Sequence, residues 1–322
     1  MIKLTSLKEH YEGFKKIKKE IGKVVVGYDE IVEDFMVCLM TGGHLLIEGV
    51  PGVAKTTLIK QFTHVLGLSY ERVQFTQDTL PADILGHYYF DAEKASFKLR
   101  KGPVFAQILM ADEINRAPPK TQSALIEAMQ EKQVTIEGTT LPLPDPFFVI
   151  ATRNPIETEG VYPLPEAQLD RFMIKSDMGY LDPKEELRML HLKNSEKEFK
   201  SLSLGDGFGL DMYGIYRKAH ASNSIIEYVR NIVLETRAIN ELALGASPRA
   251  GEHLLYASKA QAILSGRNYV IPDDVKKSAR KVIPHRLILT VDAELEGVST
   301  HMVLDDILEE KVEAPKGEFK NT

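Results

Sequence analysis

Hydrophobic positions along this 322-residue chain follow two spacings that alternate with each other. A three- and four-residue spacing, typical of an amphipathic helix, occurs near the start at Leu4, Leu7, Tyr11, Phe14, Ile17 and Ile21. Short apolar runs of strand length follow at 44–48, 71–75, 107–111 and 146–151, and helical patterns at 56–66 and 118–132 lie between them. Strands that alternate with helices predict an α/β fold with a parallel sheet covered on both faces.

Two segments interrupt this alternation, and each has the pattern of a β-hairpin. They span residues 86–102 and 133–143, and Glu137 and Gly138 would form the turn of the second one. We expect both hairpins to project from the sheet domain as inserts.

The strand pattern stops after about residue 180. Helix-like segments follow at 183–193, 224–243, 248–265 and 272–282. We therefore expect residues 1–181 to form an N-terminal helix and an α/β domain, and residues 182–308 to form a smaller, all-helical domain. The stretch 196–211, rich in Ser, Gly and Lys, is expected to be a flexible connection. Residues 294–322 hold eight acidic and three basic side chains, so we expect 309–322 to be an acidic, solvated tail.

A loop of glycine, proline and small residues follows the first strand and opens a helix, which is the context of a phosphate-binding loop. The loop residues are Gly49, Val50, Pro51, Gly52, Val53, Ala54, Lys55, Thr56 and Thr57. Lys55 would reach the β- and γ-phosphates of ATP, and the Thr56 hydroxyl would ligate Mg²⁺. Ala54 stands where the pattern GxxxxGK[ST] has glycine, and its methyl group leads us to expect a negative φ there.

Polar side chains follow two further strands of the expected sheet. The run 108–111 ends in Asp112 and Glu113, which would lie beside the phosphate loop at the carboxyl edge. Asp112 suits the Mg²⁺ shell, and Glu113 suits the base that activates water. Asn154 ends the strand at 146–151 and could hold the attacking water, although an Asn-Pro turn is the alternative.

Two arginines follow these motifs along the chain. Arg171 would lie at a helix end, where a guanidinium can stabilise charge on a transferring phosphoryl group, in its own subunit or in a neighbour. Arg249 starts a helix of the second domain and could reach the γ-phosphate across the cleft between the domains. Taken alone, each arginine is more often a solvated or capping residue, and the order of the motifs is what favours a role.

These segments resemble the MoxR family of AAA+ ATPases. The resemblance rests on GVPGVAKT at 49–56, ADEINRAPPKTQSALIEAMQE at 111–131, ATRNPIETEGVYPLPEAQLDRF at 151–172, GASPRA at 245–250, GRNYVIPDDV at 266–275 and PHRL at 284–287. It covers residues from about 27 to 289 and includes the alanine of the phosphate loop. Arg153 departs from the family, because we expect glutamine there in many relatives.

The resemblance implies a set of site residues and a mode of action. Lys55 and Thr56 would be Walker A, Asp112 and Glu113 Walker B, Asn154 sensor 1, Arg171 the arginine finger, and Arg249 sensor 2. The second domain would be the AAA+ lid. Similar proteins form rings, usually hexamers, and act as chaperone-like remodelling ATPases on client proteins or complexes, often with partners that carry a von Willebrand factor A-type domain.

Composition narrows the choice among other functions. Forty basic and forty-six acidic residues give a net charge of −6, which disfavours nucleic acid as the main partner, and the turn 137–140 of the second hairpin lacks Lys and Arg. Lys94, Lys98, Arg100 and Lys101 on the first hairpin keep a DNA-translocating motor as an alternative. A magnesium-chelatase-like motor subunit, a P-loop kinase and a nucleotide-gated scaffold are the others, and Glu113 favours hydrolysis over the last two.

Three further expectations concern location and metals. The N-terminal segment carries Lys and Glu throughout, and the longest apolar run, 35–40, is too short to span a bilayer, so we expect a cytoplasmic protein without membrane insertion. Cys38 is expected to be a buried, inert thiol. The histidines show no metal-ligand spacing, so His44 and His253 are expected to be packing residues. The one metal that we expect is the Mg²⁺ that binds together with ATP.

Overall fold

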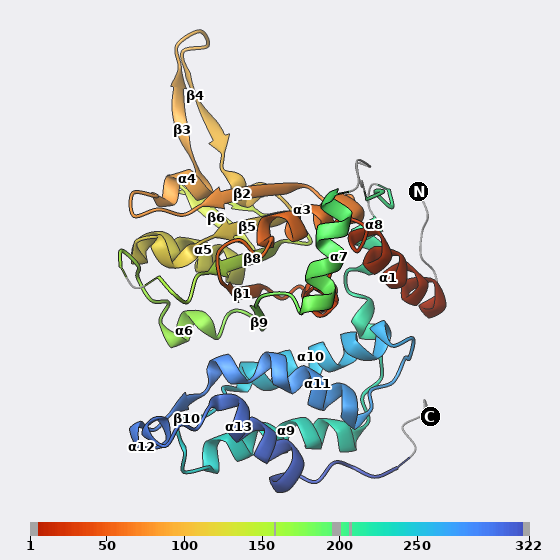
Figure 1. The fold of residues 1–322 in the computed structure, drawn as a ribbon. Helices are drawn as coiled ribbons and strands as arrows, with labels where there is room; N and C mark the ends of the chain where they lie inside the picture. The colour runs from red at the N-terminus through yellow and green to blue at the C-terminus, as the bar shows by residue number, and fades with distance from the viewer. Residues whose placement is uncertain (1–5, 158, 195–200, 206–207, 318–322) are drawn as a thin grey trace.

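A five-stranded parallel sheet forms the centre of the larger domain in the computed structural model, which describes residues 6–157, 159–194, 201–205 and 208–317 (Figure 1). The strand order is β2-β5-β8-β1-β9, and every neighbouring pair is parallel. The strands are β1 (Leu45–Gly49), β2 (Tyr70–Gln74), β5 (Ile108–Asp112), β8 (Phe148–Arg153) and β9 (Ile174–Met178). The four predicted strands are confirmed within two residues, whereas β9 was not predicted.

Alternate residues of the central strands enter two different hydrophobic cores. Leu45, Ile47 and Met110 face a core shared with α1 (Leu7–Ile21), α2 (Asp29–Thr41) and α3 (Lys55–Leu66). Leu46 and Leu109 face the other core, which holds α4 (Pro81–Leu85) and α5 (Pro119–Glu131). Because successive side chains of a strand point to opposite faces, this division confirms the predicted sheet covered on both faces.

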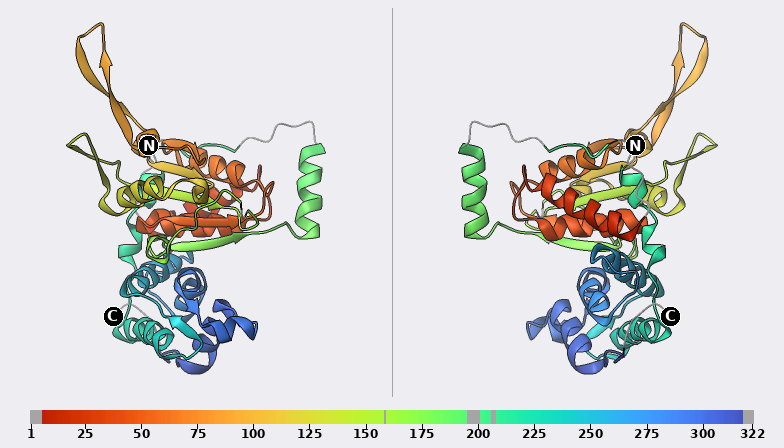
Figure 2. Two further views of the ribbon diagram at one scale, coloured as in Figure 1. Left: turned by 90° about the vertical axis from the view of Figure 1, so that its left-hand side faces the viewer. Right: turned by 90° about the vertical axis from the view of Figure 1, so that its right-hand side faces the viewer.

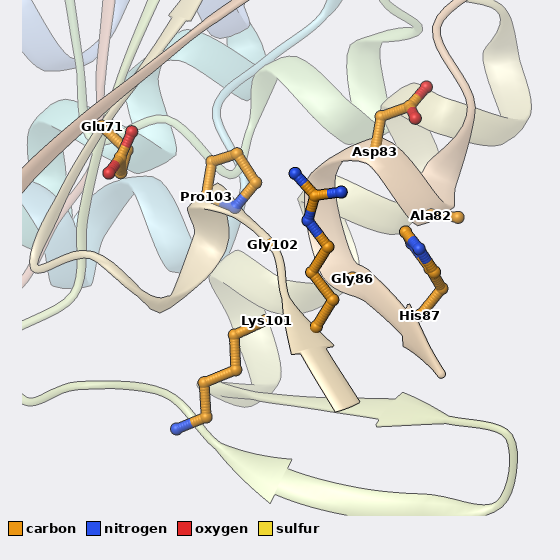
Figure 3. Close-up of a pocket in the computed structure, with 9 residues that line it drawn as sticks. Glu71, Ala82, Asp83, Gly86, His87, Lys101, Gly102 and Pro103 are labelled. Atoms are coloured by element: carbon orange, nitrogen blue, oxygen red, sulfur yellow. The ribbon is translucent and has the colours of Figure 1, made fainter. Parts of the chain in front are cut away.

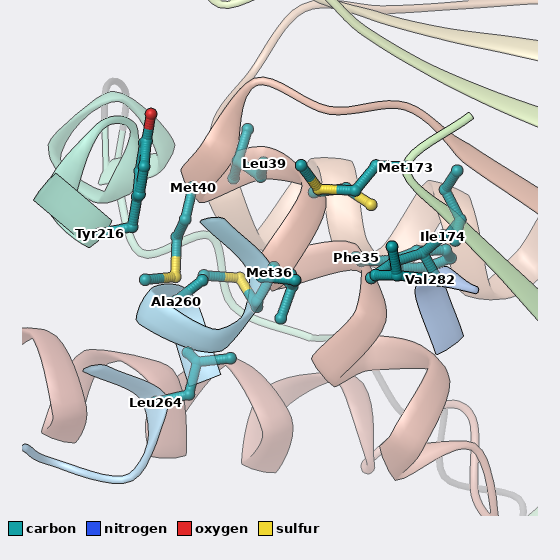
Figure 4. Close-up of a cluster of buried hydrophobic side chains, with 14 of the residues drawn as sticks. Phe35, Met36, Leu39, Met40, Met173, Ile174, Tyr216, Ala260, Leu264 and Val282 are labelled. Atoms are coloured by element: carbon teal, nitrogen blue, oxygen red, sulfur yellow. The ribbon is translucent and has the colours of Figure 1, made fainter. Parts of the chain in front are cut away.

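The helix α2 joins the sheet domain to the second domain. Nine of its thirteen residues are buried, among them Phe35, Met36 and the free thiol Cys38, and a helix that is apolar all round lies inside a core. Figure 4 shows Met36 and Met40 of α2 beside Ala260 and Leu264, with Phe35 near Ile174 and Val282. One continuous core therefore spans both domains.

The second domain is a helical lid that lies below the sheet in Figure 1. Its helices are α9 (Asn223–Ala238), α10 (Pro248–Leu264), α11 (Pro272–Val282), α12 (Val291–Leu295) and α13 (Thr300–Asp306). It is helical apart from one short antiparallel pairing of β10 (Leu242–Leu244) with β11 (Ile288–Leu289). Residues 242–243, expected to be helical, therefore belong to a strand.

The connection between the domains begins with α7 (Pro183–Asn194) and includes α8 (Phe208–Met212). The flexible connection predicted at 196–211 lies partly outside the described residues, and its end from Phe208 is helical. Order also continues past Leu308, because Glu309 pairs with Lys276 and Arg280. The domain boundaries near 181 and 308 stay predictions.

Both predicted hairpins are confirmed. They are β3 (Gly86–Asp91) with β4 (Ser96–Lys101), which projects far from the body in Figure 1, and β6 (Gln133–Ile136) with β7 (Thr139–Pro142). At the root of the first hairpin the backbones pack closely, since a Cβ on Gly102 would lie 2.2 Å from the carbonyl oxygen of Ile84. A pocket of about 430 Å³ beside this root is lined by Arg100 and His87 (Figure 3).

No helix in the described ranges combines the length and apolar composition needed to cross a bilayer.

His44 directly precedes β1 and is buried, and its ring links β1 to β8 and α5. This is the packing role that the sequence predicted. Its Nδ1 accepts a hydrogen bond from the backbone of Val149 at 3.0 Å, and its Nε2 lies 3.2 Å from the carbonyl oxygen of Met129. Burial lowers the pKa of His44 to about 4.

We predict that His44 makes the fold less stable in acid. Because the folded pKa is about 4 and the unfolded one 6.5, the neutral ring contributes stability that is fully present above pH 6.5 and is lost as the pH falls toward 4. The free energy of unfolding, measured by urea titration, should drop between pH 7 and pH 5 by about 2 kcal/mol more in the wild type than in His44→Asn. His301→Asn, at an exposed position, is the control; a wild-type slope in His44→Asn would contradict this origin.

Candidate nucleotide-binding site

The phosphate loop connects the carboxyl end of β1 to the start of α3. Ala54, the residue before the helix, has φ +65° and ψ +24°, so the expected negative φ is wrong. The left-handed conformation costs an L-residue roughly 1–2 kcal/mol, because Cβ approaches the following carbonyl oxygen. The strain is tolerated here because the turn from strand to helix fixes the backbone on both sides. The glycine pattern is thus met in conformation but not in residue type.

The start of α3 offers backbone donors to an anion. In the described structure no side chain caps this terminus, and its first turn carries no acidic residue. Lys55 lies at the same point, with Nζ donating to the carbonyl oxygen of Gly49 at 2.6 Å. Burial lowers the pKa of Lys55, and the carboxylates of Asp112 and Glu113 oppose that shift. A helix N-terminus with a nearby lysine fits the phosphates of ATP.

Asp112 and Glu113 leave the carboxyl end of β5 in different directions. Asp112 is buried and accepts from the Thr152 hydroxyl at 2.5 Å and from Arg72 Nη2 at 2.7 Å. Glu113 has φ +57°, a second left-handed residue beside the loop, and its carboxylate lies 3.0 Å from Arg116 Nε. Strained backbone of this kind clusters at functional sites.

Three residues that contact these carboxylates were missed by the sequence analysis. Arg72 and Gln74 lie on β2, where the amide of Gln74 donates to Glu113 at 2.7 Å. Arg116 follows Glu113 by three residues and also binds Glu157 at 2.7 Å. The alternation of polar side chains along 71–74, next to a strand that ends in acids, is the sequence signal that could have identified the first two.

Asn154 lies just past β8, buried, at the same edge of the sheet. Its Oδ1 accepts from the backbone of Ile156 at 3.2 Å. Hydrogen bonds from Arg116 and from Asn154 lower the pKa of Glu157, a further neighbour of Lys55. The structure thus brings Lys55, Asp112 and Asn154 together at the carboxyl edge, as the sequence predicted.

The residues present fit Mg²⁺ as well as ATP. Thr56 is the second residue of α3, and the carboxylate of Asp112 lies at the neighbouring strand end, so a hydroxyl and a carboxylate oxygen are available, which are ligands that Mg²⁺ prefers. Asp112 would share its lone pairs between the ion and Arg72. Within the ranges the structure describes, no group of three His, Cys, Asp or Glu side chains could hold a separate metal ion.

A pocket of about 510 Å³ opens beside the phosphate loop, and the sequence analysis missed it as well. Its walls come from the segment between α1 and α2, the loop itself, and α7, which stands apart from the body in Figure 2. The lining is largely apolar, with Val24, Val25, Val26, Val53, Leu181 and Met189. A pocket of this size and character next to a phosphate site fits a nucleobase.

Arg171 and Arg249 lie at the opposite edge of the sheet. Arg171 precedes β9, which runs parallel to β1 with Ile174 opposite Leu45, so Arg171 is at the amino edge. The guanidinium of Arg249 binds Asp170, the residue before Arg171, at 3.0 Å, so Arg249 lies at the amino edge as well. Five residues of strand span about 16 Å, which separates both arginines from the phosphate loop after Gly49. The expectation that Arg249 reaches the γ-phosphate across the cleft of its own subunit is therefore corrected.

Arg153 remains at the carboxyl edge with Asn154. Its guanidinium pairs with Glu48 on β1, and Lys175 of β9 binds the same carboxylate at 2.7 Å. These pairs tie the three strands β8, β1 and β9 together. Arg153 is thus held within its own subunit.

Comparisons with known proteins identify the family of this chain. The family described as "ATPase family associated with various cellular activities (AAA)" matches residues 44–174, and an AAA lid domain matches 234–307. The chain is 42% identical over 299 residues to "Chaperone MoxR1" of Mycobacterium tuberculosis, covering 90% of this chain and 79% of that protein. It is 29% identical over 302 residues to "Protein MoxR" of Methylorubrum extorquens, covering 85% and 87%.

A solved structure shows the same arrangement over nearly the whole chain. It is that of a putative ATPase from Cytophaga hutchinsonii, with a TM-score of 0.89 at 40% identity, and the match covers 96% of this chain and 97% of that one. The α/β sheet domain and the helical lid agree with the family models and with this structure. The chain therefore belongs to the MoxR family of AAA+ ATPases.

Proposed function

We propose that this protein hydrolyses ATP with Mg²⁺ in a homo-oligomeric ring of six subunits arranged head to tail. The observation that carries the proposal is the separation of the site into two halves. The phosphate loop and the acids occupy the carboxyl edge of the sheet, while Arg171 and Arg249 occupy the amino edge. A neighbouring subunit would bring its arginines against the phosphates, and such heterologous contacts close into a ring when the rotation permits.

The residues of the carboxyl edge divide the chemistry between them. Lys55 and the first amides of α3 hold the phosphates, and Thr56 and Asp112 hold Mg²⁺, which supplies charge neutralisation when bound. Glu113 accepts the proton of the attacking water, after its carboxylate exchanges Arg116 for that water. Asn154 orients the water, and the neighbour's Arg171 and Arg249 stabilise the charge on the transferring phosphoryl group.

We infer that the work done with this energy is remodelling or maturation of a client protein or complex. A relative named as a chaperone supports this role. A protein with a von Willebrand factor A-type domain is the candidate client that the family resemblance implies. The net charge of −6 argues against nucleic acid, and Lys98 of the projecting hairpin is already paired with Asp91. Both hairpins project from the sheet domain (Figure 2), where they would be accessible to such a client.

Lys55→Ala should abolish nucleotide binding, because it removes the cation that faces the phosphates. Calorimetric titration with ATP should show at least a hundredfold loss of affinity, while Lys60→Ala, at an exposed position of the same helix, should bind like the wild type. Unchanged affinity in Lys55→Ala would disprove the phosphate site.

Glu113→Gln should bind ATP normally but turn it over at least a hundredfold more slowly, because the amide keeps the shape and loses the base. The measurement is steady-state phosphate release, with Glu127→Gln on the exposed face of α5 as the control. Near-normal hydrolysis would rule out Glu113 as the base. In ATP the same variant should retain a client protein that ADP releases, which tests the remodelling role.

Arg171→Ala should bind ATP and scarcely hydrolyse it, since a guanidinium supplied in trans is worth on the order of 10³ to 10⁵ in rate in other nucleotide hydrolases. Mixed with Lys55→Ala subunits, it should recover part of the activity, because an intact phosphate loop then meets an intact arginine of the neighbour. If rings shown to be mixed stay inactive at every ratio, Arg171 does not act in trans.

A further inference from the structure

The carboxylate of Asp170 connects the two proposed trans arginines to the lid. Its Oδ2 accepts from Arg249 Nη1 at 3.0 Å, and its Oδ1 accepts from the Ser247 hydroxyl at 3.0 Å and from Arg286 Nε at 2.9 Å. Asp170 directly precedes Arg171 in the turn between α6 (Glu166–Leu169) and β9, whereas Ser247 and Arg249 begin α10. One carboxylate thus gathers elements of both domains.

Arg286 fixes the backbone on both sides of Arg171. Its side chain is 2% exposed and lies in the short turn after α11. Nη2 donates to the carbonyl oxygens of Phe172 at 2.6 Å and Asp170 at 3.2 Å, and Nη1 donates to that of Met173 at 3.2 Å. The Nε of Arg171 itself donates to the carbonyl oxygen of Ala167 in α6 at 3.3 Å.

Two histidines complete the surroundings of Arg286 without adding charge. His253 Nδ1 lies 2.8 Å from Arg286 Nη2, and His285 Nε2 lies 2.9 Å from Nη1. Burial and the charge of Arg286 lower the pKa of His253 to about 3 and that of His285 well below its usual value, so both rings are neutral. Burial lowers the pKa of Arg286 to about 10, which leaves it charged at neutral pH. The partner that balances this buried cation is Asp170.

The charges of this cluster do not cancel. The guanidinium groups of Arg249 and Arg286 both bind the carboxylate of Asp170. Arg171, the next residue in the chain, interacts electrostatically with Asp170 and with Glu131, so three cations face two carboxylates. Burial and the charge of Arg249 lower the pKa of Arg171, which reports the crowding of cations. Because Arg286 occupies one oxygen of Asp170, that carboxylate cannot fully neutralise Arg171 and Arg249. An anion brought from outside is favoured at this surface.

We propose that Arg286 is a positioning residue for ATP hydrolysis in the neighbouring subunit: it holds the Asp170–Arg171 turn and the start of α10 as one unit, and it keeps Asp170 from neutralising the arginines. The inference rests on the proposed function, because it concerns the half of the active site that each subunit supplies to the next. Arg286 itself touches no nucleotide in this scheme.

The test compares two arginines of the lid that form similar ion pairs. Arg286→Lys keeps the charge but loses the fork that reaches carbonyl groups on both sides of Arg171. Arg267→Lys is the matched control, since Arg267 binds Asp274 with two bonds of 2.7 Å at the start of α11 and has no contact with Asp170 among the described residues. With melting temperatures recorded for both, kcat should fall at least tenfold in Arg286→Lys at constant KM, and less than twofold in Arg267→Lys.

A second readout separates positioning from general stability. Arg286→Lys subunits mixed with Lys55→Ala subunits should regain activity, because the intact loop of the first then meets the intact arginines of the second. The double variant Lys55→Ala/Arg286→Lys should give no such recovery. If Arg286→Lys does not fold, Asp170→Asn replaces it as the test of positioning, because it also releases the turn from the start of α10 and from Arg286. Positioning then predicts the same loss of kcat and the same recovery in mixed rings.

Three outcomes overturn the inference. They are a kcat equal to that of the Arg267→Lys control, a loss that mixed rings do not recover, and a loss of ATP affinity in the variant's own site. The proposed function fails separately, if the wild type does not hydrolyse ATP or if Arg171→Ala retains full activity. An active wild type, an inactive Arg171→Ala and a fully active Arg286→Lys would reject the role of Arg286 alone.

Discussion

The parallel, in-register pairing of the five strands decides where every functional group of this protein can lie. Hydrogen bonds between β1 and its neighbours β8 and β9 place all carboxyl ends at one edge and all amino ends at the other. Residues that follow β1, β5 and β8 meet at the first edge, whether they are close in sequence or not. A residue that precedes β9 cannot join them, which separates Arg171 from the phosphate loop by the length of a strand.

The carboxyl edge concentrates charge and strain that the rest of the fold must support. Ala54 and Glu113 both have left-handed backbones, and Asp112 and Glu113 are held by the arginines at 72 and 116. The planar guanidinium of arginine can stay bound to one oxygen of a carboxylate while the other oxygen binds a metal ion or water. The edge is therefore both firmly built and able to exchange partners, as a site with a reaction cycle requires.

Sequence reasoning located most of the fold and the motif residues, for identifiable reasons. Strands that are buried on both faces are apolar throughout, so β1 and β5 were evident, whereas β9 alternates Lys175 and Asp177 with buried residues and carries a weaker signal. Motif residues follow strand ends, which fixes their edge. The position of Arg249 depends on how the lid packs, and the lid is placed by α2 and by Asp170, contacts between residues far apart in sequence. The positive φ of Ala54 was not predicted, because an alanine by itself favours a negative φ. Here the strand before it and the helix after it set the conformation of the loop.

The continuous core around α2 has a consequence for synthesis of the chain. The helix leaves the ribosome early, but Ala260 and Leu264, which cover its lid-facing side, follow more than two hundred residues later. At a typical elongation rate of about 5–20 residues per second, that side waits roughly ten seconds or longer for its partners. During this interval the nascent sheet domain exposes Met36 and Met40, a surface on which chaperones that bind unfolded chains would act.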